Sequence, residues 1–167
     1  PILIPRLAKV LPSSGRTEYV NKSFKIFASK RIVKFYEMEY AISRSDLKVA
    51  LNRVRTMVEE KEFKLNFPVE VRFTAADGIP LSTAYDRQSA YIAVHIFKGM
   101  EYERYFHEVE KIMNDYDGRP HWGKLHFQTL KSLSSRYPEL QRFADVRNRL
   151  DPEGVFTNDY LRRVLGR

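Results

Sequence analysis

The order in which the hydrophobic period changes along residues 32–123 limits the folds open to this chain. Short runs rich in aromatic and β-branched residues are typical of strands, and two longer runs repeat apolar residues at helical spacing. The resulting order is strand 32–43, helix 45–61, strand 69–74, strand 89–97, helix 101–116 and strand 119–123. This is the order of the split βαβ, ferredoxin-like fold. We therefore predict an α+β chain with an antiparallel sheet and two helices on one face. Its first and third strands are central, flanked by the fourth and second.

The segments before the first helix are assigned from local signals. Residues 1–18 contain prolines at positions 5 and 12 and a Ser-Ser-Gly run, and we expect a connector there. Residues 19–28 carry aromatic and β-branched side chains and are predicted to form a further strand. Ser43 and Asp46 have the spacing of a capping box at the start of the first long helix.

Two helices are expected after the sheet. An amphipathic pattern begins at Pro138 and runs to Leu150. A shorter helix is predicted over 157–165, with Thr157 as its N-cap.

Composition narrows the classes of site and of location. The 167 residues suit one domain, and none of them is cysteine. Disulfides, thiolate metal sites and thiol nucleophiles are therefore excluded, which fits a reducing compartment. No window is long and apolar enough to cross a membrane, and the first residues lack the features of a signal peptide. We expect a cytoplasmic protein, with association with a membrane surface left open.

The net charge of +8 is compatible with nucleic acid, an acidic membrane surface or an anionic cofactor. The basic residues are mostly scattered, so charge alone selects none of these. RNA-recognition modules place stacking aromatics on the third strand of a similar fold. Here that strand, SAYIAVHIF (89–97), lacks the glycine and the basic opening of their motif. We do not expect nucleic acid as a partner.

Glu70 and Arg72 are the first candidates for chemistry. Residues two apart on a strand point to the same face. The pair can be an exposed ion pair worth about 0–1 kcal/mol. It can also line a pocket, where the carboxylate accepts hydrogen bonds from substrate hydroxyls and the guanidinium supplies a fixed positive charge. Lys124 on the last strand is either a surface lysine or a third member of this group, and Trp122 beside it is expected to pack.

Metal and nucleophile motifs are missing from the sequence. The histidines at positions 95, 107, 121 and 126 have no carboxylate cluster or HExxH spacing, so we predict no metal site. His95 lies on the most apolar strand, where a hydrogen-bonded core histidine is the common outcome. No GxSxG elbow, GxGxxG turn or P-loop occurs.

Three motifs resemble the C-terminal part of sugar-1,4-lactone oxidases. They are FPVEVRFT (67–74), GRPHWGKLH (118–126) and RNRLDPEGVFTNDYLRRVLG (147–166), in the family's order over residues 30–167. That family includes gulonolactone, galactonolactone and arabinonolactone oxidases and dehydrogenases, with alditol oxidases as near relatives. All belong to the vanillyl-alcohol-oxidase superfamily of flavoproteins.

The resemblance implies that residues 19–167 form a cap domain, which places substrate-binding groups over the flavin of an FAD-binding domain. Glu70, Arg72 and Lys124 are then the catalytic and substrate-binding groups, with His95 as a further substrate-binding residue. The cofactor is FAD, and contacts with it are assigned to Arg72, Lys124, His126 and Asn158. If so, Glu70, Arg72 and Lys124 project from the sheet face opposite the helices. That face should also be richer in aromatic and apolar residues than a solvated surface.

The chain departs from such enzymes in having no FAD-binding domain, because it lacks a Gly-rich pyrophosphate loop and an attachment histidine. We expect a fragment or one chain of a split enzyme, inactive alone. Its partners would be the FAD-binding domain and a sugar lactone or polyol. The alternative is a free-standing ferredoxin-like module that binds RNA or a small anion. The sequence leaves open lactone against alditol, and oxygen against another electron acceptor.

Overall fold

A computed structural model describes residues 18–28 and 32–166, so nearly all of the expected connector lies outside the described residues. The first described element is a short helix, α2 (Ser23–Phe27), where a strand was predicted. Its backbone hydrogen bonds close locally, for example from Ala28 N to Phe24 O at 3.1 Å. A strand needs a neighbouring strand for these bonds, and the described strands pair with one another instead.

The described strands form one antiparallel sheet in the order β2-β3-β1-β4, as predicted. The strands are β1 (Phe35–Ser43), β2 (Glu70–Thr74), β3 (Ser89–Phe97) and β4 (Arg119–Pro120). All nine residues of β1 pair with β3, so these two strands form the centre of the sheet.

Strand β4 is shorter than the predicted 119–123, because the backbone turns after Pro120. Lys124 N donates to His121 O at 3.0 Å, which closes the turn. Two backbone hydrogen bonds to β1 flank the turn. They run from His121 N to Glu39 O and from Leu125 N to Glu37 O, both at 2.9 Å. The turn therefore carries Lys124 over the edge of the central strand.

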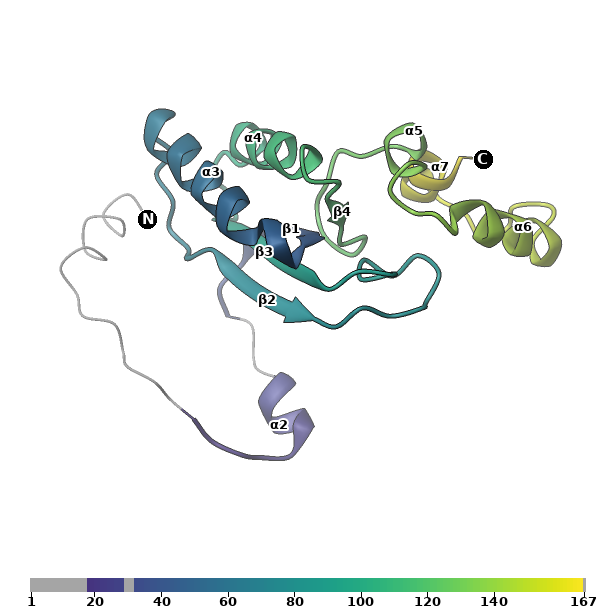
Figure 1. Cartoon of the computed structure of the whole chain (residues 1–167), viewed down its shortest axis with the longest axis horizontal. Coiled ribbons are helices and arrows are strands. Elements are labelled where there is room, and N and C mark those ends of the chain that lie inside the picture. The colour runs from purple at the N-terminus through teal and green to yellow at the C-terminus, as the bar shows by residue number, and fades with distance from the viewer. Residues whose placement is uncertain (1–17, 29–31, 167) are drawn as a thin grey trace.

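Two helices, α3 (Leu47–Glu60) and α4 (Glu103–Asn114), cover one face of the sheet, as predicted (Figure 1). The main core lies between them and the sheet. Its strand residues alternate along β1 and β3: Met38, Tyr40, Ile42, Ile92, Val94 and Ile96.

The predicted capping box is not formed. Ser43 Oγ is hydrogen-bonded to Ser45 Oγ at 2.9 Å instead of to the helix backbone. A turn of 3-10 helix, η1 (Arg44–Asp46), follows the strand, and α3 begins only at Leu47. The side-chain bond between the serines replaces the bond that a cap would make.

The C-terminal helices pack around a second, smaller core, beyond β4 in Figure 1. They are α5 (Leu130–Leu133), which was not predicted, α6 (Leu140–Leu150) and α7 (Asp159–Leu165). Trp122 packs here, with its ring 5.8 Å from that of Tyr137. The N-cap of α7 is Asn158, whose Oδ1 accepts from Leu161 N at 2.9 Å, and not Thr157 as predicted.

Candidate active site on the open sheet face

The sheet face opposite α3 and α4, here termed the open face, carries charged side chains at its centre. Met38 and Tyr40 of β1 point to the helices, so their neighbours Glu37 and Glu39 lie on the open face. The same alternation along β2 and β3 places four more side chains there: Glu70, Arg72, Ala93 and His95.

Two cations meet on one carboxylate oxygen. Lys124 Nζ lies 2.6 Å from Glu39 Oε2, and Arg72 Nη2 lies 3.0 Å from the same atom. Each cation also has a second partner: Lys124 contacts Glu37 Oε1 at 2.5 Å, and Arg72 Nε contacts Glu70 Oε1 at 3.1 Å. The predicted placement of Glu70, Arg72 and Lys124 on one face is confirmed.

His95 extends this arrangement, with Nε2 3.2 Å from Glu37 Oε1. The six residues thus form a continuous chain in which acids alternate with Arg72, Lys124 and His95, here termed the open-face network: Glu70, Arg72, Glu39, Lys124, Glu37 and His95.

Burial within the network is graded. The Glu39 side chain is 3% exposed and that of Lys124 is 15% exposed, whereas Arg72 is 49% exposed. A buried charge is costly unless it is paired and hydrogen-bonded. Glu39 is therefore held by its two cations, and Arg72 still presents part of its guanidinium to the surface.

Glu37 is ionised at neutral pH despite its partial burial. Burial alone raises the pKa of its carboxyl, but the hydrogen bond and charge of Lys124, with a smaller effect of His95, lower this pKa below its ordinary value of 4.5. The network therefore holds Lys124 between two negative charges.

Aromatic side chains border the network at one end, as expected for the open face. The His95 ring lies 5.1 Å from Phe35, edge to face, and 5.8 Å from Phe67. Phe67 in turn stacks on Phe97 at 6.5 Å. The centre of the open face is charged, as the predicted positions of Glu70, Arg72 and Lys124 imply, but the acids Glu37 and Glu39 beside Lys124 were not expected there. The His95 side chain is only 9% exposed, and its Nε2 atom faces the Glu37 carboxylate rather than solvent.

An open groove lies beside Lys124. Its walls include Phe35, Glu37, Trp122 and Tyr160. A small molecule in this groove would meet the Lys124 and Glu37 side chains at the edge of the network.

The sequence as a whole matches the family model of D-arabinono-1,4-lactone oxidase over residues 1–164. The chain belongs to the D-arabinono-1,4-lactone oxidase family.

Relatives of this lactone oxidase family share more than the motifs. The chain is 52% identical to an L-gulono-1,4-lactone dehydrogenase of Mycobacterium tuberculosis, over 99% of this chain and 39% of that protein. It is 38% identical to L-gulonolactone oxidase of Bos taurus, over 91% of this chain and 36% of that protein. With an alditol oxidase of Streptomyces sp. the identity is 32% over 77% of this chain and 31% of that protein. The chain thus spans about two fifths or less of these curated relatives.

Two residues assigned to the cofactor by resemblance to the lactone oxidases lie outside the open-face network. His126 is buried, with Nε2 2.8 Å from Tyr160 Oη and Nδ1 accepting from Gln128 N at 3.2 Å. Asn158 caps α7. A contact of either residue with a flavin stays a prediction. Tyr160 lies between His126 and the groove beside Lys124, so it is the nearer side chain to that opening.

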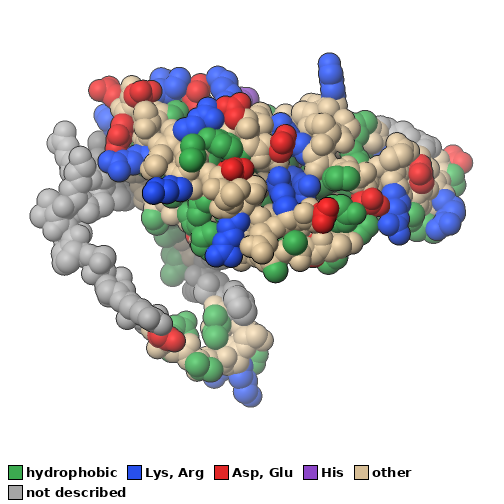
Figure 2. Space-filling view, viewed as in Figure 1, with side chains coloured by type: hydrophobic (Ala, Val, Ile, Leu, Met, Phe, Trp, Pro, Cys, Tyr) green, Lys and Arg blue, Asp and Glu red, His purple; other side chains and the backbone are tan. Residues whose placement is uncertain are grey.

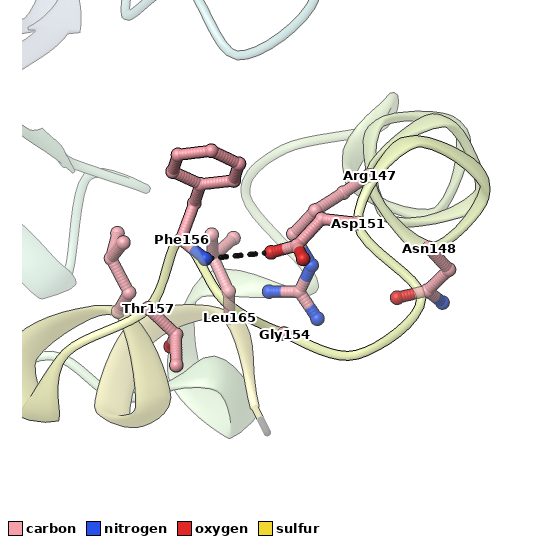
Figure 3. A pocket seen from close by; sticks show the side chains of 8 residues that line it. Arg147, Asn148, Asp151, Gly154, Phe156, Thr157 and Leu165 are labelled. Carbon is pink, nitrogen blue, oxygen red and sulfur yellow. Dashed lines mark hydrogen bonds between the residues drawn. The ribbon is translucent and has the colours of Figure 1, made fainter.

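The third family motif of the lactone oxidases builds a pocket between α6 and α7 (Figure 3). Asp151 accepts from Val155 N at 2.8 Å and from Phe156 N at 2.9 Å. Arg147 donates to Gly166 O at 3.2 Å. These bonds join the loop and the last helix to α6, so the polar groups of this motif serve the local fold.

Glu37 and Glu39 were missed as candidates. The signal was present in FYEMEY (35–40), where two acids alternate with residues that face the core. Acids at alternate strand positions ordinarily indicate a solvated face. Only the position of Lys124, 85 residues further along the chain, makes Glu39 part of a site.

The RNA-binding alternative gains no support from these findings. The named relatives are lactone and alditol oxidoreductases. On the side of the molecule seen in Figure 2, Lys and Arg side chains lie among Asp and Glu rather than in one basic stripe.

Within residues 18–28 and 32–166, no group of three or more His, Asp or Glu side chains is arranged to hold a metal ion. None of the helices in that part has the length and apolar character to cross a membrane.

Proposed function

We propose that this chain is the cap domain of an FAD-dependent oxidoreductase. Its substrate would be an aldono-1,4-lactone or an alditol, oxidised at an alcohol group. The observation that carries this proposal is the pair of cations, Arg72 and Lys124, held on the buried carboxylate of Glu39 at the open face. The names of the relatives support the substrate class.

The residues of the open face fit a flavin and a polyol. Arg72 and Lys124 are donors that can stabilise an anionic oxygen or the negative charge of a reduced flavin. The neighbouring aromatic residues Phe35, Phe67 and Phe97 offer an apolar border for a planar ring. FAD would supply the hydride acceptor when it is bound.

The chain's own residues would position the substrate and stabilise charge. The half-exposed Glu70 carboxylate accepts hydrogen bonds from substrate hydroxyls. Arg72 and Lys124 would lie beside the alcohol oxygen that is oxidised, and their charges would favour the negative charge that develops on it. His95 would not touch the substrate directly. It would act through Glu37, whose carboxylate it contacts.

The rest of the full-length protein would supply the FAD-binding domain, which covers the open face. The relatives are more than twice the length of this chain, so each has enough further sequence to form another domain. Isolated residues 1–167 would then bind no flavin tightly and would show no turnover.

The test is made on the full-length protein that contains this chain. The protein is purified and its FAD is measured by absorbance. It is then assayed with L-gulono-1,4-lactone, D-arabinono-1,4-lactone and a set of alditols, with oxygen and with a dye as electron acceptors. We expect flavin in the protein and turnover of at least one of these substrates. Tight, salt-dependent binding of single-stranded RNA without any such turnover would overturn the proposal.

A further inference from the structure

Glu39 makes contacts that set it apart from the other acids of the open-face network. Its Oε2 atom accepts from both Lys124 Nζ, at 2.6 Å, and Arg72 Nη2, at 3.0 Å. The same side chain is 3% exposed, on the central strand β1. We infer that Glu39 is the positioning residue of the site, which holds the two cations side by side without touching the substrate. This inference rests on the proposed function.

The need for such a residue follows from electrostatics. Two cations that converge on one point repel each other, and the repulsion grows when they are partly removed from water. A carboxylate between them turns this repulsion into two attractions. Arg72 is half-exposed, so without Glu39 its long side chain is free to follow Glu70 toward the solvent.

The backbone around Glu39 makes it a rigid support. Its neighbours Met38 and Tyr40 are fully buried in the main core, and its carbonyl accepts from His121 N at 2.9 Å. Glu39 is paired with Ala93 of β3, and Ala93 is paired with Glu70 of β2. The small Ala93 side chain leaves room above β3 for Arg72 to reach from Glu70 to Glu39.

Glu37 has a different place in the network. Its ion pairs are with Lys124 and His95, whereas those of Arg72 are with Glu39 and Glu70. Loss of Glu39 therefore leaves Lys124 with one carboxylate and Arg72 with Glu70, so the fold keeps partners for both cations. Glu39→Gln is accordingly a variant that removes the negative charge between the two cations and leaves each cation with another carboxylate.

The test uses the full-length protein with FAD bound. Flavin reduction is followed after anaerobic mixing with saturating substrate, for the wild type, Glu39→Gln, Arg72→Ala and the double variant. We expect Glu39→Gln to slow reduction by about a hundredfold, as misplacement of catalytic groups by about 1 Å does. The double variant should be slower than Arg72→Ala by clearly less than the hundredfold that Glu39→Gln costs alone, because the part of the Glu39 effect that acts through Arg72 is already lost. A crystal structure of Glu39→Gln should show Arg72 displaced from Lys124.

Glu110→Gln is the matched control. Glu110 is also a buried acid, but it accepts from Tyr40 Oη and Phe127 N on the helix side of the sheet. Its loss should lower the melting temperature and leave the rate of flavin reduction unchanged.

Three results would overturn the inference. One is a normal rate in Glu39→Gln while Arg72→Ala is slow. Another is an additive effect in the double variant, and the third is an unmoved Arg72 in the variant structure. If the wild type itself reduces no flavin with any tested substrate, the proposed function fails instead, so the two failures are distinguishable.

Discussion

At the scale of single residues, Lys124 is part of the proposed site and also a partner of two carboxylates. It lies between Glu37 and Glu39 and is 15% exposed. Lys124 lies outside the hydrophobic core, but its two carboxylate partners need its charge. We predict that Lys124→Met lowers the free energy of unfolding by about 1–3 kcal/mol, the cost of unsatisfied buried acceptors.

The measurement is urea unfolding of the full-length protein at neutral pH, with two comparison variants. Arg72→Ala should cost less than Lys124→Met, because Arg72 is half-exposed. Lys111→Met removes an exposed lysine that forms an ion pair with Glu108, and it should change stability by less than about 0.5 kcal/mol. Equal stability of all three variants would contradict the buried network.

His126 gives stability a defined dependence on pH. Burial and the nearby charge of Arg163 lower the pKa of His126 to about 4, from 6.5. Between these values the unfolded chain binds a proton that the folded chain does not. The free energy of unfolding therefore falls as pH decreases from about 6.5 to about 4, and this effect levels off below that. We predict a loss on the order of 3 kcal/mol.

Replacement of His126 by Gln should flatten that slope. The measurement is the free energy of unfolding at a series of pH values for the wild type and His126→Gln. Parallel curves for the two proteins between pH 6.5 and pH 4 would show that His126 is protonated equally in both states.

At the scale of the elements, the long periodic segments were predictable, and so were β2 and α7, whereas α2, α5 and the end of β4 were not. β1, β3, α3 and α4 carry enough alternating or helical positions to bury one face, so their periods identify them. α2 and the truncated β4 depend on partners that the local sequence does not specify. Likewise, Glu70 and Arg72 were recognisable from their spacing, whereas Glu39 gains its role only from distant Lys124.

A substitution of Ala93 on β3 tests whether the pairing of the strands positions the residues of the open-face network. It is paired with Glu39 on one side and Glu70 on the other, and it is fully buried. We predict that Ala93→Val keeps the fold, because valine favours strands. Its added methyl groups should displace Arg72 and reduce turnover of the full-length protein by about tenfold or more. Normal turnover with normal substrate affinity would show that Arg72 does not need this space.

The N-terminus of α7 offers a second prediction at this scale. Asn158→Ala removes the cap and should lower the free energy of unfolding by about 1 kcal/mol, whereas Asn158→Asp keeps an acceptor there and should not. FAD content of the two purified variants tests the predicted cofactor contact. If both variants bind FAD as the wild type does, Asn158 serves the helix alone.

At the scale of the whole molecule, the helices and the site divide the sheet between them. One face builds the core with α3 and α4, and the other presents two cations, three acids and a border of aromatic rings. The fold class and this division followed from the sequence, because strand alternation assigns every second residue to one face. The shape of the C-terminal helices around Trp122 did not, because it depends on packing between segments far apart in the chain.

The most direct test of the central claim is the rate of flavin reduction in the full-length protein after anaerobic mixing with its best substrate. Arg72→Ala and Lys124→Met should each reduce flavin about a hundredfold or more slowly than the wild type, as loss of one oxyanion donor does. The exposed control Lys111→Met should match the wild type. Reduction at the wild-type rate in both site variants, with FAD fully bound, would show that the open face of this sheet is not where the alcohol is oxidised.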